Sequence, residues 1–168
     1  MYDSSLSVNV KTTMKFKFKL NIIYGDLFQA SNPSSSLAHC VSSDFKCGKG
    51  IATVFIKKFV RINEFRGKKI PVGQVAVLKE GNRYIYNLVT KLKFNDEPTY
   101  QSMKHSLSKM KEHALRFNVK EISMPKIGCG LDRLSWDVVE SIIKDVFIET
   151  DITISVYILG NKSDARIP

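Results

Sequence analysis

The sequence has few of the features that mark membrane, secreted or metal-binding proteins. It contains no run of about 18 apolar residues, so a membrane-spanning helix is not expected. The N-terminus has neither the apolar core nor the small-residue cleavage site of a secretory signal peptide. Only three cysteines are present, without a Cys-x-x-Cys spacing, which argues against a disulfide framework. We therefore expect the protein in a reducing compartment, the nucleus and/or the cytoplasm.

Acidic residues are scarce as well. The chain has 16 Asp and Glu against 26 Lys and Arg, for a formal net charge of +10. Residues 1–80 carry 13 basic and 5 acidic side chains, whereas residues 81–168 carry 13 and 11. This field favours an anionic partner, which could be nucleic acid, a phosphorylated ligand or an acidic protein surface. A basic face that is merely solvated is the alternative, and charge alone does not choose between them.

The residues that are present indicate one α/β domain. A length of 168 residues suits a single domain, which we place at residues 14–159 between tails at 1–13 and 160–168. Alternating or β-branched apolar patterns predict strands at residues 15–24, 37–41, 74–78, 83–89, 119–124 and 152–159. Apolar residues at helical spacing predict helices at residues 51–60, 98–117 and 136–147. Pro98 is expected to open the second helix, and alternating strands and helices indicate an α/β sandwich around a central sheet.

The most informative segment joins the predicted strand at 119–124 to the helix that begins at Trp136. Residues 124–134, Met-Pro-Lys-Ile-Gly-Cys-Gly-Leu-Asp-Arg-Leu, form a glycine loop of the kind that brings backbone N–H groups close to a phosphate. The loop is neither a Walker nor a dinucleotide fingerprint, because it lacks a Gly-Lys-Ser/Thr ending and a third glycine. A plain tight turn is the alternative. Asp132 lies just beyond the glycines, where it could reach an adjoining sugar.

Two more loops follow predicted strands, at residues 25–28 and 45–50. In open α/β sheets, ligands bind in a crevice at the carboxyl ends of the strands. Two of the three loops are rich in glycine and two carry an aspartate. We therefore predict a ligand site where these loops meet.

These segments resemble the macrodomain family of ADP-ribose-binding modules. Gly25-Asp26-Leu27-Phe28 matches its first-strand motif, and His39-Cys40-Val41-Ser42 with Gly48-Lys49-Gly50-Ile51-Ala52 matches its first ligand loop. The chain is most similar to the terminal ADP-ribose protein glycohydrolases, through Tyr84-Ile85-Tyr86, Thr90-Lys91, Pro98-Thr99-Tyr100 and the whole of residues 124–134. The resemblance spans about residues 22–159 and implies a three-layer α/β/α fold with a central mixed β-sheet. Tyr24 and Lys49 depart from the family pattern, and Lys49 would either clash in the first ligand loop or add a contact to a phosphate.

The resemblance implies an extended ADP-ribose site. Asp26 would accept a hydrogen bond from the adenine amine, since a carboxylate prefers a donor, although an Asx-type turn explains this residue equally simply. The backbone of the glycine loop would hold the diphosphate, and the loop at 45–50 would line the distal ribose. The other residues assigned to substrate binding are Leu27, Ser42, Gly48, Gly50, Ile51, Thr90, Pro125, Gly128, Cys129, Gly130, Leu131 and Leu159.

Lys91 and Asp132 would carry the chemistry by the same resemblance. The lysine would attack the anomeric carbon of the distal ribose, and the aspartate would transfer protons and help to release the lysine-bound sugar. A lysine is a nucleophile only when it is neutral, and direct pairing with a carboxylate opposes that state. We therefore expect the two side chains to face the sugar from different sides, or to exchange a proton during the reaction. Taken alone, Lys91 would be a surface lysine at a strand end.

Other constellations are weaker. Cys129 and His39 lack the third residue that would orient a Cys–His hydrolase, and His39, Cys40 and Cys47 do not have zinc spacing. A two-carboxylate glycosidase would need a second acid beside Asp132, and none is near in the sequence. His105 and His113 are expected at the surface of their helix.

We expect a monomeric hydrolase that removes mono-ADP-ribose from glutamate and aspartate side chains of ADP-ribosylated proteins. Deacetylation of O-acetyl-ADP-ribose is expected too, because both reactions cleave an ester at the same ribose. No metal, cofactor or membrane partner is implied. The alternatives are a reader that binds ADP-ribose without cleaving it, and a nucleic-acid-binding module that uses the basic N-terminal half.

Overall fold

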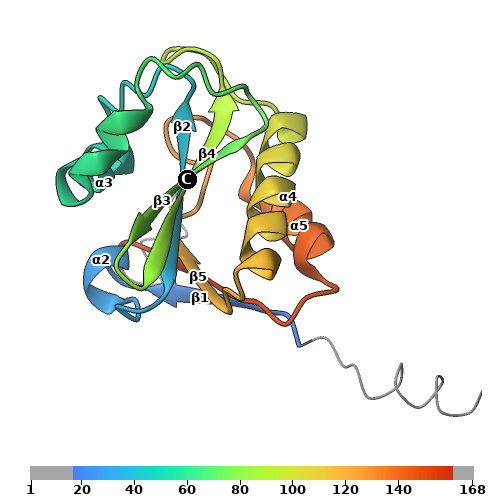
Figure 1. The fold of residues 1–168 in the computed structure, drawn as a ribbon. Helices are drawn as coiled ribbons and strands as arrows, with labels where there is room; N and C mark the ends of the chain where they lie inside the picture. The colour runs from blue at the N-terminus through green and yellow to red at the C-terminus, as the bar shows by residue number, and fades with distance from the viewer. Residues whose placement is uncertain (1–16, 161–168) are drawn as a thin grey trace, which may run out of the picture.

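The computed structural model describes residues 17–160, which form a six-stranded sheet with helices on both faces (Figure 1). The expected N-terminal tail, residues 15–16 of the first predicted strand and most of the C-terminal tail lie outside the described residues. The strands are β1 (Lys19–Tyr24), β2 (Ser36–Ser42), β3 (Val75–Glu80), β4 (Arg83–Lys91), β5 (Glu121–Met124) and β6 (Thr153–Ile158). The helices are α2 (Leu27–Ala30), α3 (Ile51–Lys58), the 3-10 helix η1 (Val60–Phe65), α4 (Tyr100–Arg116) and α5 (Trp136–Phe147).

The sheet is mixed, as expected. Its strand order is β1-β6-β5-β2-β4-β3, and every neighbouring pair is parallel except β3 with β4. The antiparallel pair is a hairpin closed by Gly81 and Asn82, with Glu80 opposite Arg83. Gly81 has φ 60°, which suits the left-handed turns that match strand twist. Because β1, β6, β5, β2 and β4 run parallel to one another, their carboxyl ends lie along one edge of the sheet.

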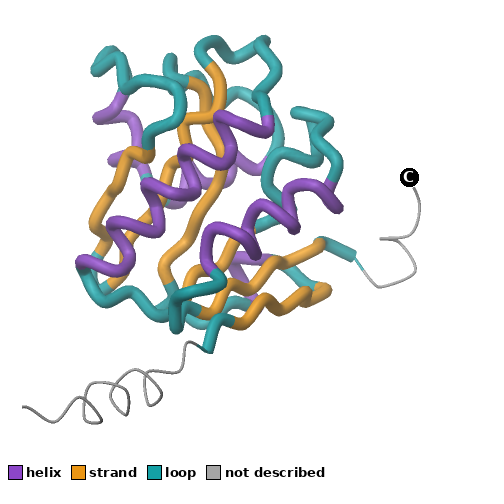
Figure 2. Tube along the Cα trace, turned by 90° about the vertical axis from the view of Figure 1, so that its right-hand side faces the viewer, coloured by secondary structure: helices purple, strands orange, loops and turns teal. Residues whose placement is uncertain are grey.

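The helices form two outer layers, which confirms the three-layer α/β/α fold. Helices α4 and α5 lie beside each other on one face of the sheet, while α3 covers the other face (Figures 1 and 2). A separate hydrophobic core lies under each layer. None of the described helices is both long and apolar enough to cross a membrane.

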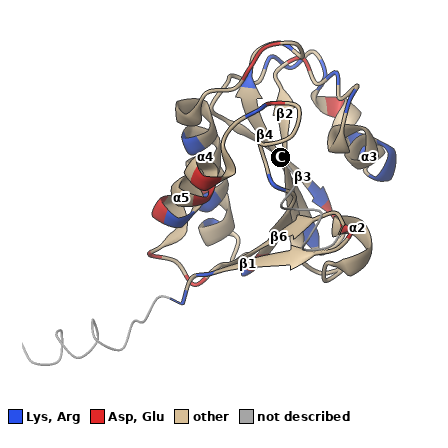
Figure 3. Cartoon of the chain, turned by 180° about the vertical axis from the view of Figure 1, so that it is seen from behind, with Lys and Arg blue, Asp and Glu red and all other residues tan. Residues whose placement is uncertain are grey.

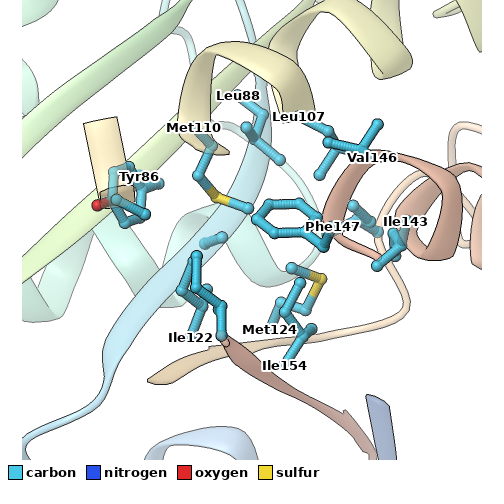
Figure 4. Close-up of a cluster of buried hydrophobic side chains, with 14 of the residues drawn as sticks. Tyr86, Leu88, Leu107, Met110, Ile122, Met124, Ile143, Val146, Phe147 and Ile154 are labelled. Atoms are coloured by element: carbon cyan, nitrogen blue, oxygen red, sulfur yellow. The ribbon is translucent and has the colours of Figure 1, made fainter. Parts of the chain in front are cut away.

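The apolar stripe of α4 builds the larger core. Met103, Leu107, Met110 and Ala114 are fully buried. They belong to one cluster with residues of α5 and with strand residues such as Ile122. Figure 4 shows Leu107, Met110 and Ile122 converging in this cluster. Burying a side chain of this size stabilises the fold by about 1.5–3 kcal/mol, so the spacing seen in the sequence accounts for the docking of the helix.

Three expectations about α4 and its surroundings are wrong. The helix begins at Tyr100, not Pro98, because Thr99 caps it: the Thr99 hydroxyl accepts the Ser102 N–H at 3.0 Å, and Ser102 Oγ accepts the Thr99 N–H at 3.1 Å. Phe117, the last residue of the predicted helix, is the C-cap outside α4 and is 46% exposed. His113 is half-buried and bonded to Tyr86 Oη at 2.8 Å.

Candidate functional site

A cavity of about 620 Å³ opens at the carboxyl ends of β2, β4 and β5, where the sequence predicted a ligand site. The loops that follow these strands form its walls. Of the predicted site residues, those that line this cavity are Ser42, Gly50, Ile51, Lys91, Pro125, Gly128, Gly130, Leu131 and Asp132. Asp26, Leu27, Gly48, Thr90, Cys129 and Leu159 do not.

Strand register brings the centre of the site together. Ser42, the last residue of β2, lies opposite Lys91, the last residue of β4. The Ser43 N–H donates to the Lys91 carbonyl at 2.8 Å, which extends the ladder beyond the strand ends. Lys91 is thus presented from a strand end, where the backbone is firmly paired.

Lys91 and Asp132 form a direct ion pair. Lys91 Nζ lies 2.7 Å from Asp132 Oδ1, and the two side chains are only 15% and 18% exposed. Of the two expected arrangements, opposite faces of a sugar or a proton exchange, the direct contact favours the second. The hydrogen bond between them provides a direct path for a proton, which leaves proton exchange as the consistent alternative.

Asp44, which the sequence did not single out, braces two loops of the site. Its Oδ1 accepts hydrogen bonds from the Ser42 hydroxyl and the Lys46 N–H, and its Oδ2 accepts the Phe94 N–H at 3.0 Å. Burial alone would raise the pKa of Asp44, but these hydrogen bonds outweigh it and the pKa lies below its ordinary value. An aspartate that follows a strand end by two residues is typical of an Asx turn, and that was the available signal.

Phe94 lies between the first ligand loop and the ion pair. Its ring centroid is 5.5 Å from Lys49 Nζ and 6.0 Å from Lys91 Nζ, within the range of cation–π contacts. A Cβ built on Gly48 would approach the same ring to 3.4 Å, an ordinary contact distance. Lys49 therefore lies on an aromatic surface at the cavity wall. Nothing in the spacing of the sequence marks Phe94.

The glycine loop offers most of the predicted backbone donors. The Cys129 N–H donates to the Lys126 carbonyl at 3.3 Å and is therefore engaged within the loop. The N–H groups of Gly128, Gly130 and Leu131 have no acceptor among residues 17–160. A Cβ on Gly130 would meet nothing within 4 Å, so the backbone is open at this point.

The residues predicted to bind adenine lie beside β1, at the far end of the same edge of the sheet. Asp26 Oδ1 accepts the Phe28 N–H at 2.8 Å, which caps α2 as an Asx turn would. The Gly25 N–H donates to the Ile158 carbonyl at 2.8 Å, so the ends of β1 and β6 are joined. Leu159 follows β6 and is 78% exposed.

Leu27 is buried in the core under α3, and Thr90 is also buried. Four strand spacings separate β1 from β4 in the sheet, or about 19 Å. The predicted residues are thus spread along the carboxyl edge of the sheet, from β1 to β4, and do not share one pocket.

The geometry favours neither a Cys–His hydrolase nor a zinc site. His39 is fully buried, stacks on Phe55 with centroids 3.8 Å apart and bonds Asn87 at 2.6 Å. Burial lowers the pKa of His39 to about 4, against a smaller opposing effect of the Asn87 bond. Burial raises the pKa of the Cys129 thiol to about 11, and its Sγ donates to the Ile127 carbonyl. No cluster of metal-ligating side chains occurs among residues 17–160.

Sequence comparisons point to one family. The model described as Macro domain matches residues 29–143. The ADP-ribose glycohydrolases OARD1 of Homo sapiens and Bos taurus are each 48% identical over 141 residues, which cover 84% of this chain and 92% of theirs. The ADP-ribose 1''-phosphate phosphatase of Meyerozyma guilliermondii is 27% identical over 177 residues, covering 84% of this chain and 99% of its own.

Solved structures agree on the fold. The macrodomain of Thermus aquaticus DarG superposes with a TM-score of 0.75 at 23% identity, covering 83% of this chain and 98% of that one. The macrodomain of Mycobacterium tuberculosis DarG gives 0.73 at 22% identity, with 81% and 96% covered.

Proposed function

Because the chain belongs to the Macro domain family, we propose that it is an ADP-ribose glycohydrolase that frees mono-ADP-ribose from glutamate and aspartate side chains. The observation that carries this proposal is the Lys91–Asp132 pair at the wall of the cavity. A nucleophilic lysine needs a group that takes its proton, and Asp132 is within hydrogen-bonding distance. The human and bovine relatives, which are named ADP-ribose glycohydrolases, support the same reaction class.

The extended edge fits the proposed ligand. The free N–H groups of Gly128, Gly130 and Leu131 would hold the diphosphate, with Lys126 and Arg133 also on the cavity wall. Asp26 retains a second carboxylate oxygen beyond the one that caps α2, and that oxygen would accept the adenine amine. The distal ribose would then lie beside Ser42 and the ion pair.

In the proposed reaction, Lys91 first passes its proton to Asp132. The free amine of Lys91 attacks the anomeric carbon, and the bond from that carbon to the substrate carboxylate breaks. The carboxylate leaves with the bonding electrons and takes the proton from Asp132, while the Lys91 nitrogen remains a protonated secondary amine. Water then attacks the same carbon as the Asp132 carboxylate takes a proton from the water, the bond from the carbon to the nitrogen breaks, and Lys91 leaves as a neutral amine. Asp132 returns its proton to Lys91, which restores the ion pair. An acetyl ester at the anomeric oxygen of this ribose would present the same kind of leaving group, a carboxylate, so O-acetyl-ADP-ribose is a second proposed substrate.

The test compares the wild type with Lys91→Ala on a protein that carries mono-ADP-ribose on glutamate. We expect the wild type to release ADP-ribose and Lys91→Ala to release none while still binding free ADP-ribose in calorimetry. Lys93→Ala is the matched control, because Lys93 is exposed and outside the cavity lining. In Asp132→Ala, solvent water can take the Lys91 proton, because the side chain is partly exposed, but no carboxylate activates the water of the second step. Mass spectrometry of this variant is therefore expected to find a sugar adduct on Lys91.

Two outcomes contradict the proposal. Full release by Lys91→Ala removes lysine from the mechanism. Binding of ADP-ribose by the wild type without any release indicates a reader in place of a hydrolase.

A further inference from the structure

A second cavity, of about 350 Å³, lies on the α3 face of the sheet. Its walls come from α2, the loop after α2, the last turn of α3 and the first residues of β2 and β4. Phe28, Leu37 and Phe59 provide apolar walls, while Lys58 and Arg83 provide positive charge. Nothing in the proposed glycohydrolase reaction uses this cavity.

The two cavities are separate. They share no lining residue. Arg83 is the first residue of β4 and Lys91 is the last, so the strand places the two sites about 26 Å apart. A ligand in the second cavity would therefore approach the amino end of the strands.

Aromatic rings hold both cations of the second cavity in place. Lys58 Nζ lies 5.3 Å from the Phe28 ring centroid, and Arg83 Cζ lies 5.5 Å from that of Phe59. A cation–π contact orients a cation but does not neutralise it. Neither cation has an ion-pair partner among residues 17–160. Their positive charge thus remains available to a ligand.

The surroundings of Arg83 strengthen this point. No Asp or Glu is among the cavity-lining residues, and the acid that acts on Arg83 is Glu80, its partner across the hairpin. Burial lowers the pKa of Arg83, against the opposing effect of Glu80. One guanidinium N–H donates to the Ser35 carbonyl at 3.4 Å, which leaves other N–H groups of the fork free.

The end of α3 beside the cavity carries charge of the same sign. Basic residues occupy the end of α3, where Lys57 precedes Lys58 (Figure 3). This field would raise the local concentration of anions. A guanidinium fork and an ammonium group on the walls of one cavity match the oxygens of a phosphate, and the apolar walls match a flat or hydrocarbon group.

From this combination we propose that the second cavity binds a phosphate ester carried on a flat, apolar group. The Arg83 fork and the Lys58 ammonium would contact the phosphate, and Phe28, Leu37 and Phe59 would surround the apolar part. The same chemistry is available from a small aryl phosphate and from a phosphorylated tyrosine side chain.

The test is a titration of the isotope-labelled full chain with phenyl phosphate, followed by amide NMR. We expect saturable shifts at Ser31, Lys58, Phe59 and Arg83, with a dissociation constant of about 1 mM or tighter. Phenol, which lacks the charge, is expected to give none. A phosphotyrosine peptide is the second arm: tighter binding than phenyl phosphate identifies a protein-borne ester, and weaker binding identifies a small molecule.

Variants locate the site. Lys58→Gln and Arg83→Gln are each expected to weaken binding by about tenfold or more, the effect of losing one charge-assisted hydrogen bond. Lys57→Gln is the matched control, since Lys57 neighbours Lys58 on α3 but does not line the cavity. If Arg83→Gln fails to fold, exposed Lys58 decides the result alone. The absence of saturable shifts, shifts confined to residues 126–132, or equal affinity in all three variants would overturn the proposal.

Discussion

Gly128 and Gly130 lie two residues apart in the loop after β5, yet a methyl group added to each would meet different surroundings. At Gly128 the new Cβ would lie 2.7 Å from Met103 Cε and 2.9 Å from Leu134 Cδ1, and the residue has φ +72°. At Gly130 the new Cβ would have nothing within 4 Å, and φ does not lie in the left-handed region. The pair therefore separates the effect of a side chain on core packing from its effect on the cavity, within one loop.

The expected cost of Gly128→Ala follows from two effects. An L-residue in the left-handed region costs about 1–2 kcal/mol, and overpacking a close-packed core costs about 1–3 kcal/mol. The loss of glycine's freedom in the unfolded chain returns about 0.4–1 kcal/mol. We expect a net destabilisation of about 1–5 kcal/mol, which corresponds to a fall in Tm of about 2–20 °C for a domain of this size.

Gly130→Ala is expected to unfold at the wild-type temperature or slightly above it. Its methyl group would instead enter the cavity beside the free N–H groups, so we expect weaker ADP-ribose binding without a loss of stability. The assay is thermal unfolding by circular dichroism for all three proteins, followed by calorimetry with ADP-ribose. Equal stability of the two variants would refute the steric argument, and unchanged binding by Gly130→Ala would refute the assignment of this loop to the diphosphate.

Two further predictions concern polar side chains, the half-buried Asp44 and the buried His39. Asp44→Asn replaces one acceptor oxygen with a donor and is expected to lower the free energy of unfolding by about 1.5–3 kcal/mol. It is also expected to speed hydrogen exchange of the Phe94 amide, whose hydrogen bond it weakens. Unchanged exchange at that amide would show that Asp44 does not brace the two loops. His39, whose pKa is about 4 when folded and 6.5 when unfolded, makes the unfolded state bind more protons between these values. Stability should therefore fall as the pH drops from about 6.5 towards 4, by about 3 kcal/mol in total, and urea unfolding curves that stay the same at pH 7 and pH 4.5 would contradict it.

The elements of the fold could be predicted because each depends on a local pattern. The stripe from Met103 to Ala114 has helical spacing, and the paired runs on either side of Gly81-Asn82 predict the hairpin that is found. The ends of the helices depend instead on capping hydrogen bonds. The capping box of Thr99 and Ser102 makes α4 begin at Tyr100, two residues after Pro98. The same local logic identified the glycine loop and its place at a strand end.

The sequence by itself determined the layers of this protein, the position of its glycine loop and the strand end that presents Lys91, since apolar periodicity and backbone geometry act over a few residues. Only the tertiary structure decided which polar groups meet. The 2.7 Å pair of Lys91 with Asp132 joins residues 41 apart, and the bond between Asp44 and Phe94 joins residues 50 apart. Side chains so distant in the chain come together through the order of strands in the sheet, β5-β2-β4 at this point. That order results from the packing of the whole core, and it cannot be predicted from the spacing of residues along the chain.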